Sequence, residues 1–599
     1  MHQSPLFLSE NINKRNEKGV MGNLYLTIDI LQGLEFTARS SARWTNNYTS
    51  LFTNGVDQSL GWEGSNVNEL RKINGESLYW QTDFLLNYEG SLGEDHYLTG
   101  VLGYSREEQT FESLSGYGNG TPSNAIRYLN AADPTSLRTD NDFSDWAFTG
   151  MFGRLGYTFK EKYILNATVR RDGTSRLAEN YRYGVFPSVS AAWRVSRENF
   201  MQDVDWLSEL KLRASWGTVG NVLSIGTYGT KTSLNNRNYI LGQPQEPALG
   251  YTLTSAINTD LKWETTEKKN IGLDIEMLQN RIYLITDFFI EDTYDLLFRQ
   301  PIPMSTGLSG SPYINAGKIR NTGVELELGY RQTVDDWQYS FNVNMSHFKN
   351  EVLDLEGRDL RTEGIVEGHT LKSHFGYVSN GIIRTQEELE NYPHYPGKEI
   401  GDIWLKDING YDEEGNLTGE PDGTVNAADR ALLGNDLPNI QYGATGTLGY
   451  RQLTLQVQLQ GLQGLSRDIR GGTNLGALHY FTQWAKNHDR LILDRYHPEK
   501  NPDGKYPRVT ANDAGSNLLF SDFWLSDASY LRISNVNLSY DFTSNFVEKI
   551  GVGNLGAYVS VQNLYTFTDF YGPEVDSNAD VLTGVPQPRT WTLGLKVGF

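Results

Sequence analysis

The most chemically suggestive part of the sequence is a stretch rich in acid and amide side chains near its middle. Two runs, 407–410 (Asp-Ile-Asn-Gly) and 422–429 (Asp-Gly-Thr-Val-Asn-Ala-Ala-Asp), are separated by the eleven residues 411–421. If those eleven are treated as an insertion, the runs join into a loop with EF-hand spacing, in which Gly423 supplies the tight turn. Calcium favours such oxygen donors, and the ligands would be Asp407, Asn409, Asp422, the Thr424 carbonyl, Asn426 and Asp429.

The interruption leaves other interpretations of this stretch open. The last ligand would be Asp429, which is shorter than the Glu that usually closes an EF-hand loop. Asp412 or Glu413 inside the insertion could replace one of the ligands. The stretch could also be a solvated acidic loop without a metal.

Aromatic side chains in the longest predicted loops form a second candidate site. A ring can stack on a sugar face or on a peptide side chain, and a bound substrate would need such surfaces. The alternative is that the rings pack the loops against one another or against a partner protein. The residues selected as candidate substrate contacts are Tyr377, Trp404, Tyr480 and Trp484.

Other chemistries are excluded by motif and composition. The sequence contains no His-Glu-x-x-His, Gly-x-Ser-x-Gly or Walker loop, so we expect no enzymatic activity and no organic cofactor. It contains no cysteine, which excludes disulfide frameworks and thiolate metal sites. Asp and Glu (73) exceed Lys and Arg (52), and the formal charge of −21 argues against a nucleic-acid partner. If the chain lines a lumen, the field of its acidic residues there would disfavour anionic cargo and so favour neutral glycans.

The elements that must position these residues are strands, because the hydrophobic period along most of the chain is two. One example is the segment 453–459, where Leu453, Leu455, Val457 and Leu459 alternate with polar residues such as Gln456 and Gln458. This pattern gives each strand one apolar and one polar face. No run of 18 apolar residues occurs, which excludes helical membrane spans but not a transmembrane β-barrel.

About 17 strands are predicted, and many have the 9 to 11 residues that a tilted membrane-crossing strand needs. The connections alternate between short and long, as in outer-membrane barrels with tight periplasmic turns, and the longest loops are 349–439 and 462–528. The predicted strands are 22–30, 34–45, 77–89, 95–110, 145–159, 162–172, 187–195, 209–216, 264–277, 281–292, 318–330, 337–348, 440–450, 452–461, 529–541, 555–563 and 590–599.

The final segment has its own signal. Its apolar residues alternate with Thr592, Gly594, Lys596 and Gly598 and end on an aromatic residue, which resembles the sorting signature read by the outer-membrane barrel assembly machinery. The alternative is an edge strand that happens to end in Phe. The residues of this candidate assembly signal are Trp591, Leu593, Leu595, Val597 and Phe599.

Several short motifs, in family order over nearly the whole chain, resemble the SusC/RagA family of TonB-dependent outer-membrane transporters. They are 152–157 (Phe-Gly-Arg-Leu-Gly-Tyr), 170–176 (Arg-Arg-Asp-Gly-Thr-Ser-Arg), 186–190 (Phe-Pro-Ser-Val-Ser) with Trp193-Arg194, 212–217, 317–325, 531–536 and 561–564. The resemblance implies a 22-stranded barrel around a plug domain. It also implies TonB-driven import of oligosaccharides or peptides, with a SusD-like lipoprotein lid outside the cell outer membrane.

The chain departs from that family pattern at its start. Residues 1–18 show no signal peptide, and about 17 of the 22 family strands are found, with no plug before them. We therefore expect an all-β, transmembrane antiparallel β-barrel of the TonB-dependent receptor type that is incomplete, with residues 1–599 forming its C-terminal part. TonB would be contacted through the missing N-terminal part. The competing function is a non-transporting surface or soluble β-protein that binds glycans.

Overall fold

A computed structural model defines the fold of most of the chain. The described residues are 11–55, 67–232, 234–237, 239–242, 246–248, 250–253, 255–300, 302–308, 310–358, 360–410, 417–470, 490–509, 516–542, 547, 552–572, 574–575 and 587–598. Among these residues, no helix has the length and apolar character needed to span a membrane.

The dominant element is a seventeen-stranded sheet in which neighbouring strands run antiparallel. It contains no plug domain within the described ranges, and the all-β prediction is confirmed. Its strands are β1 (Ile12–Leu31), β2 (Leu34–Thr53), β3 (Glu69–Leu92), β4 (His96–Asn119), β5 (Arg138–Phe159), β6 (Tyr163–Thr174), β7 (Tyr183–Arg194), β8 (Leu207–Asn221), β13 (Glu264–Met277), β14 (Ile282–Tyr294), β17 (Lys318–Val334), β18 (Trp337–Asp354), β23 (Ile440–Tyr450), β24 (Leu453–Gln463), β27 (Tyr530–Asp541), β28 (Asn554–Thr568) and β29 (Thr590–Gly598).

Shorter elements lie in the connections between these strands. Small strands are β9 (Leu234–Asn236), β10 (Tyr239–Leu241), β11 (Glu246–Ala248), β12 (Tyr251–Leu253), β15 (Leu297–Arg299), β16 (Tyr313–Asn315), β19 (Ser373–Tyr377), β20 (Ser379–Ile382), β21 (Ile403–Leu405), β22 (Arg430–Asn435), β25 (Ser466–Asp468) and β26 (Leu525–Asp527). The helix α2 (Gln386–Asn391) begins at a capping box formed by Thr385 and Glu388. Short 3-10 helices occupy Leu129–Ala131, Pro134–Ser136, Glu179–Tyr181, Val195–Arg197, Asn199–Met201, Met304–Thr306, Arg361–Glu363, Ala427–Asp429, Arg490–Asp494 and Asp522–Trp524.

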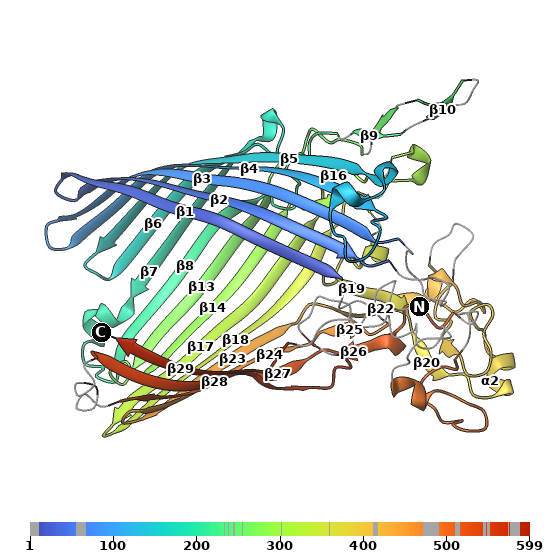
Figure 1. Ribbon diagram of the computed structural model, residues 1–599. Coiled ribbons are helices and arrows are strands. Elements are labelled where there is room, and N and C mark those ends of the chain that lie inside the picture. The colour runs from blue at the N-terminus through green and yellow to red at the C-terminus, as the bar shows by residue number, and fades with distance from the viewer. Residues whose placement is uncertain are drawn as a thin grey trace. The chain divides into compact units, whose positions relative to one another are not determined.

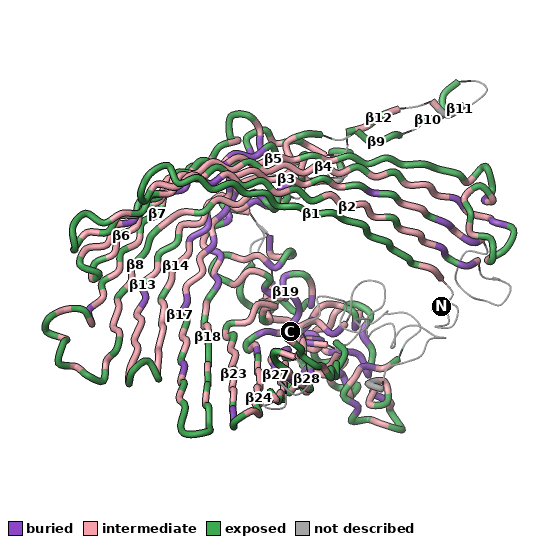
Figure 2. The backbone as a smooth tube through the Cα atoms, turned by 60° about the vertical axis from the view of Figure 1, so that its left-hand side comes forward, coloured by how far each residue is buried: buried purple, intermediate pink, exposed green. Residues whose placement is uncertain are grey.

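The chain divides into two compact units. Unit 1 comprises Met1–Arg194, Arg213–Lys269 and Glu291–Lys318, and unit 2 comprises Val195–Leu212, Asn270–Ile290 and Ile319–Phe599. In unit 1, strands β2 to β7 lie side by side in sequence order (Figure 1). Strand β1 pairs with β2 along its length, and almost all of its residues are exposed, as the green tube in Figure 2 shows.

The short turns of unit 1 fix the register of its hairpins. Gly33, between β1 and β2, has a φ of 79°, and its carbonyl accepts a hydrogen bond from the Glu89 N–H at 2.7 Å. A side chain at Gly33 would collide with the Glu89 carbonyl. Lys160 and Glu161 join β5 to β6 with φ values of 50° and 55°, the left-handed pair that a two-residue hairpin turn requires.

Five strands of unit 1 extend well past their predicted ends. Strand β1 begins at Ile12 instead of residue 22, and β2 ends at Thr53 instead of residue 45. Strands β3, β4 and β5 reach Glu69, Asn119 and Arg138, whereas the sequence predicted 77, 110 and 145. All five extensions lie on the side of the long connections. These extensions carry polar residues on both faces, including Glu112, Ser113 and Ser115, so the regular alternation that reveals a strand is interrupted there although the ladder of hydrogen bonds continues.

Each unit has its own hydrophobic core. In unit 1 the core lies beneath the long connections and consists of Leu177, Phe186, Val222, Ile225, Leu261, Trp263 and Leu297. In unit 2 the two longest loops fold together into a packed loop body around the fully buried Trp524. Within the loop body, β19 pairs with β22, β20 with β21, and β25 with β26. The Tyr377 N–H also donates to the Phe520 carbonyl at 2.8 Å, which joins the first loop to the second.

A buried carboxylate holds the two loops together. Asp402 has 0% of its surface exposed. Its Oδ1 accepts hydrogen bonds from Arg508 Nε at 2.7 Å and from Asn517 Nδ2 at 2.9 Å. Its Oδ2 accepts from the Glu399 N–H at 2.8 Å. Because Asp402 lies in the first loop while Arg508 and Asn517 lie in the second, this network stabilises the loop body as one unit.

Replacing Asp402 with Ala is expected to open the loop body. The change leaves the Arg508 guanidinium without its main buried partner, and breaking such a pair costs about 3 to 5 kcal/mol. The matched control is Asp336→Ala, because Asp336 pairs with Arg451 at 2.8 Å where both side chains are about half exposed, and such pairs contribute about 0 to 1 kcal/mol. Amide hydrogen exchange at Tyr377 and Ile403 in detergent-solubilised protein measures the opening. Equal exchange rates in the two variants would contradict the assignment.

Candidate functional site

The two faces of the large sheet are chemically distinct, and the strand register in unit 2 shows this directly. A row of directly paired residues crosses six strands and is apolar throughout, with one glycine. It consists of Phe341, Gly446, Val457, Val536, Val561 and Trp591. A second row on the same face has the same character and consists of Tyr339, Leu448, Leu455, Leu538, Val559 and Leu593.

The intervening rows belong to the opposite face and contain only polar residues. One is Asn342, Thr445, Gln458, Asn535, Gln562 and Thr590, and the next is Ser340, Thr447, Gln456, Asn537, Ser560 and Thr592. The polar side chains bond to one another, since Asn342 Nδ2 donates to both Tyr283 Oη and Glu327 Oε1 at 2.7 Å. The alternation predicted for 453–459 therefore extends into continuous apolar and polar surfaces.

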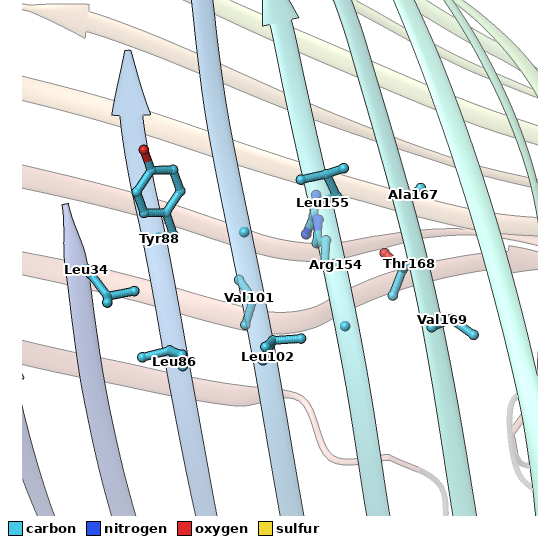
Figure 3. A pocket seen from close by; sticks show the side chains of 12 residues that line it. Leu34, Leu86, Tyr88, Val101, Leu102, Arg154, Leu155, Ala167, Thr168 and Val169 are labelled. Atoms are coloured by element: carbon cyan, nitrogen blue, oxygen red, sulfur yellow. The ribbon is translucent and has the colours of Figure 1, made fainter. Parts of the chain in front are cut away.

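In unit 1 the apolar face contains a groove of about 510 Å³ (Figure 3). Leu86, Leu102 and Leu155, from neighbouring strands, line it. Gly100 and Gly153 also line the groove, and because they lack side chains they leave it open; a Cβ on Gly153 would lie 3.3 Å from Leu102 Cδ2. A groove with this lining fits hydrocarbon chains and offers little to a polar ligand.

The C-terminal strand β29 presents its apolar residues to the outside of unit 2. It pairs with β28, and Leu593 is 81% exposed, with Trp591, Leu595 and Val597 also exposed. On the other face, the ring of Tyr558 lies over Gly594, where a side chain would collide with it. Phe599 lies outside the described residues. The assembly role of this strand stays a prediction.

The acidic stretch forms one ordered turn in which the carboxylates bind backbone amides. Asp429 is fully buried, and its Oδ1 accepts from the N–H groups of Ile408 and Asn409 at 2.7 and 3.0 Å. Asp407 accepts from the N–H groups of Asp422 and Gly423 at 3.2 and 2.8 Å. These bonds bring the two runs 407–410 and 422–429 side by side, as the calcium hypothesis requires.

The remaining predicted ligands also bond to the backbone of this turn. Asn409 Oδ1 accepts from the Gly419 N–H at 2.6 Å, Asp422 Oδ1 from Thr424 at 2.8 Å, and Asn426 Oδ1 from Ala428 at 2.8 Å. Among the described residues, no three carboxylate or imidazole groups gather closely enough to hold a metal ion. Asp412 and Glu413 lie outside those residues. The calcium site therefore stays a prediction, and binding would require carboxylate oxygens to turn from amides to the cation.

The predicted aromatic contacts occupy different environments. Tyr377 is 2% exposed and belongs to the core of the loop body, where the Arg430 guanidinium lies 5.5 Å from its ring centre. Burial raises the pKa of the Tyr377 hydroxyl, an effect that Arg430 opposes. The ring thus packs the loops and presents no face to a substrate in this structure. Trp404 is partly buried between Tyr392 and His394. Tyr480 and Trp484 lie outside the described residues.

A third feature, which the sequence analysis did not predict, is a cavity on the polar face of unit 1. Trp146, Phe148 and Trp263 are among its lining residues. The sequence did contain a signal. Trp146, Phe148 and Phe152 are even-numbered and so lie on the same face of β5 as the polar residue Arg154, whereas Met151 and Leu155 lie on the other face. Aromatic residues that alternate in phase with the polar face mark a site on that face.

Comparison with known proteins identifies relatives over nearly the whole chain. Residues 3–564 match the family model described as "TonB dependent receptor-like, beta-barrel". The chain is 28% identical to TonB-dependent receptor P26 of Formosa agariphila over 98% of its length, and 28% identical to TonB-dependent receptor SusC of Bacteroides thetaiotaomicron over 95%. Its fold is similar to that of the RagAB peptide transporter, with a TM-score of 0.82 and 23% identity over 99% of the chain.

The chain spans little more than half the length of these relatives. It covers 60% of P26, 53% of SusC and 63% of the RagAB transporter chain. The resemblance to the SusC/RagA family that the sequence motifs indicated is confirmed by these matches. That residues 1–599 are the C-terminal part of a longer receptor stays a prediction.

Calcium is expected to order the turn at 407–429, because a cation offsets the repulsion among its carboxylates. Adding CaCl₂ should slow proteolysis of this segment, and Asp422→Ala plus Asp429→Ala should abolish the protection. Asp422→Asn alone is the sharper test, since Asp429 also caps backbone amides and its loss loosens the turn with or without metal. If calcium does not protect the wild-type segment, or if it protects the variants as well as the wild type, the stretch is an acidic turn only.

Proposed function

Because the chain belongs to the TonB dependent receptor-like β-barrel family, we propose that it builds much of the wall of an outer-membrane importer. Members of this family lie in the outer membrane and are receptors for transport rather than enzymes. The observation that carries the proposal is the division of the sheet into continuous apolar and polar faces. In a transmembrane barrel the apolar face contacts lipid and the polar face lines the lumen.

The groove and the polar rows fit this arrangement. The glycine-floored groove between Leu86, Leu102 and Leu155 would lie against lipid acyl chains. The polar rows that include Gln456 and Gln458 would line a hydrated interior, where amide and hydroxyl groups can exchange hydrogen bonds with water or cargo. Backbone donors and acceptors of strands that have a neighbour on both sides would then be satisfied within the sheet.

The cargo we propose is an oligosaccharide. The formal charge of −21 disfavours anionic solutes, and a neutral glycan avoids that repulsion. Peptides are the second candidate, because one protein of similar fold is described as a peptide transporter. We further propose a SusD-like lipoprotein as the lid and TonB as the source of energy, both on the strength of the SusC/RagA resemblance.

Uptake by the full-length receptor tests the proposed function. A deletion strain should lose growth on at least one neutral oligosaccharide and recover it when the gene is returned, while growth on the corresponding monosaccharide is unchanged. The protein should fractionate with detergent-extracted outer membranes. Absence from that fraction, or loss of growth on peptides alone, would contradict glycan import.

Substitutions at Val457 and Gln458 test which face contacts lipid. Val457→Arg places a charge in hydrocarbon and is expected to destabilise the complete barrel by about 2 to 4 kcal/mol when the position lies near the midplane. Gln458→Arg, one residue away, places the same side chain among Thr445 and Asn535 on the polar face and should be tolerated. Urea unfolding of the full-length protein in lipid vesicles measures both. Equal stability of the two variants would reverse or remove the assignment of faces.

A further inference from the structure

The cavity on the polar face of unit 1 has a volume of about 600 Å³, within the range of small-molecule sites. It lies where β6 and β8 end at their long connections, next to the start of β13. All its lining residues belong to unit 1. They are Gln81, Asp83, Leu85, Ser105, Glu107, Trp146, Phe148, Thr149, Gly150, Phe152, Arg170, Asp172, Arg176, Gly220, Asn221, Val222, Leu223 and Trp263.

One wall of the cavity is a chain of aromatic rings held in fixed orientations. Trp146 and Phe148 meet edge to face with ring centres 5.4 Å apart, and Phe148 meets Trp263 in the same manner at 6.4 Å. Trp263 in turn packs on Phe186 at 5.4 Å within the core of unit 1. Because the core fixes Trp263, the rings are preorganised and binding would cost little side-chain entropy.

The other wall carries polar groups that are already paired with one another. Gln81 Nε2 donates to Asp83 Oδ1 at 3.0 Å, and Arg170 Nε donates to Asp172 Oδ1 at 2.6 Å. Tyr79 Oη donates to Glu107 Oε2 at 2.7 Å. Each carboxylate keeps further lone pairs that can accept a hydroxyl proton from a ligand.

Arg176 joins the aromatic and polar walls. Its guanidinium carbon lies 5.6 Å from the Trp146 ring centre, and its Nη1 donates to the Ile225 carbonyl at 2.7 Å. Its Nε is buried and has no hydrogen-bond partner among the described residues. Burial lowers the pKa of the Arg176 guanidinium, which reflects its loss of water. A buried donor without a partner is costly, and a ligand oxygen would satisfy it.

The combination of rings and paired charges selects the class of ligand. Three carboxylates and two guanidinium groups line the cavity, so an anionic ligand would be repelled by the carboxylates, and a purely apolar one would displace water from these groups without replacing its hydrogen bonds. A pyranose ring offers C–H groups, whose partial positive charge is attracted to a ring face, and hydroxyl groups that both donate and accept. A neutral sugar therefore matches both walls.

We propose that this cavity is a subsite for one sugar unit of a neutral oligosaccharide, stacked on Trp146 and hydrogen-bonded to Asp83, Glu107 and Arg176. The inference rests on the proposed function, in which the polar face lines the import path. It goes further by assigning the residues that would hold the cargo. Trp263 acts as a positioning residue, because it fixes the orientation of Phe148.

The test uses the purified full-length receptor in detergent and isothermal titration with defined probes. The probes are a neutral glucan heptasaccharide, a neutral xylan hexasaccharide, a galacturonate oligosaccharide and an unstructured decapeptide. For a neutral probe that binds the wild type, Trp146→Ala is expected to raise Kd at least tenfold, which corresponds to about 1.4 kcal/mol. Asp83→Asn preserves shape and should raise Kd severalfold.

Trp80→Ala is the matched control, because Trp80 lies on the neighbouring strand β3 with its side chain on the opposite face of the sheet. Its Kd should equal that of the wild type. Heat-modifiability on gels reports whether each variant is a folded barrel. If Trp146→Ala does not fold, the Kd of Asp83→Asn for the neutral probe tests the subsite instead.

The possible outcomes distinguish a failure of the proposed subsite from a failure of the proposed function. If the wild type imports and binds a neutral oligosaccharide but neither Trp146→Ala nor Asp83→Asn weakens binding, the subsite is wrong while glycan import stands. If the wild type binds only the decapeptide or the galacturonate probe, the sugar assignment is overturned together with the proposed cargo. Reduced barrel stability with unchanged Kd would mean that the cavity receives another part of the receptor and not a sugar.

Discussion

The structure depends on one requirement, which is that a strand in hydrocarbon must satisfy all its backbone hydrogen bonds with neighbouring strands. Continuous pairing of this kind fixes the register, and the register decides which side chains share a row. A shift of one residue between β23 and β24 would place Gln458 beside Gly446 and move Gln456, Gln458 and Gln460 to the apolar face. The separation of apolar and polar rows is therefore a property of the whole sheet and not of single strands.

Prediction from sequence succeeded where the two faces of a strand differ in polarity, because apolar and polar residues then alternate along the sequence. Strands β13 and β23 were predicted with the bounds that they have, and in β23 the alternation of apolar and polar residues runs from Ile440 to Tyr450. Prediction failed at the ends of β1 to β5 that lie away from the short turns, where polar residues occur on both faces and interrupt the alternation. The backbone pairing there is invisible to any method that reads side-chain periodicity alone.

Candidate sites were harder to predict than strands, because their character depends on contacts between distant residues. The sequence cannot show that Tyr377 is enclosed by the loop body or that Asp429 caps the amides of Ile408 and Asn409. It also cannot show that Trp263 lies beside Phe148, since 115 positions separate them and only the sheet brings them together. Tyr377, selected because it lies in a long predicted loop, is a core residue, while aromatic residues of β5 on the polar face line a cavity.

The composition of the loop body has a consequence for the order in which the protein folds. Its core draws residues from Tyr377 to Val575, so it cannot close until all of these residues are available to pack together. Closing contacts over such long separations is slow, because the entropy of each intervening segment must be lost first. The hairpins of the sheet need only adjacent strands and can form earlier. The loop body is thus completed after the hairpins of the sheet, and its contacts cannot guide the pairing of the strands that form before it.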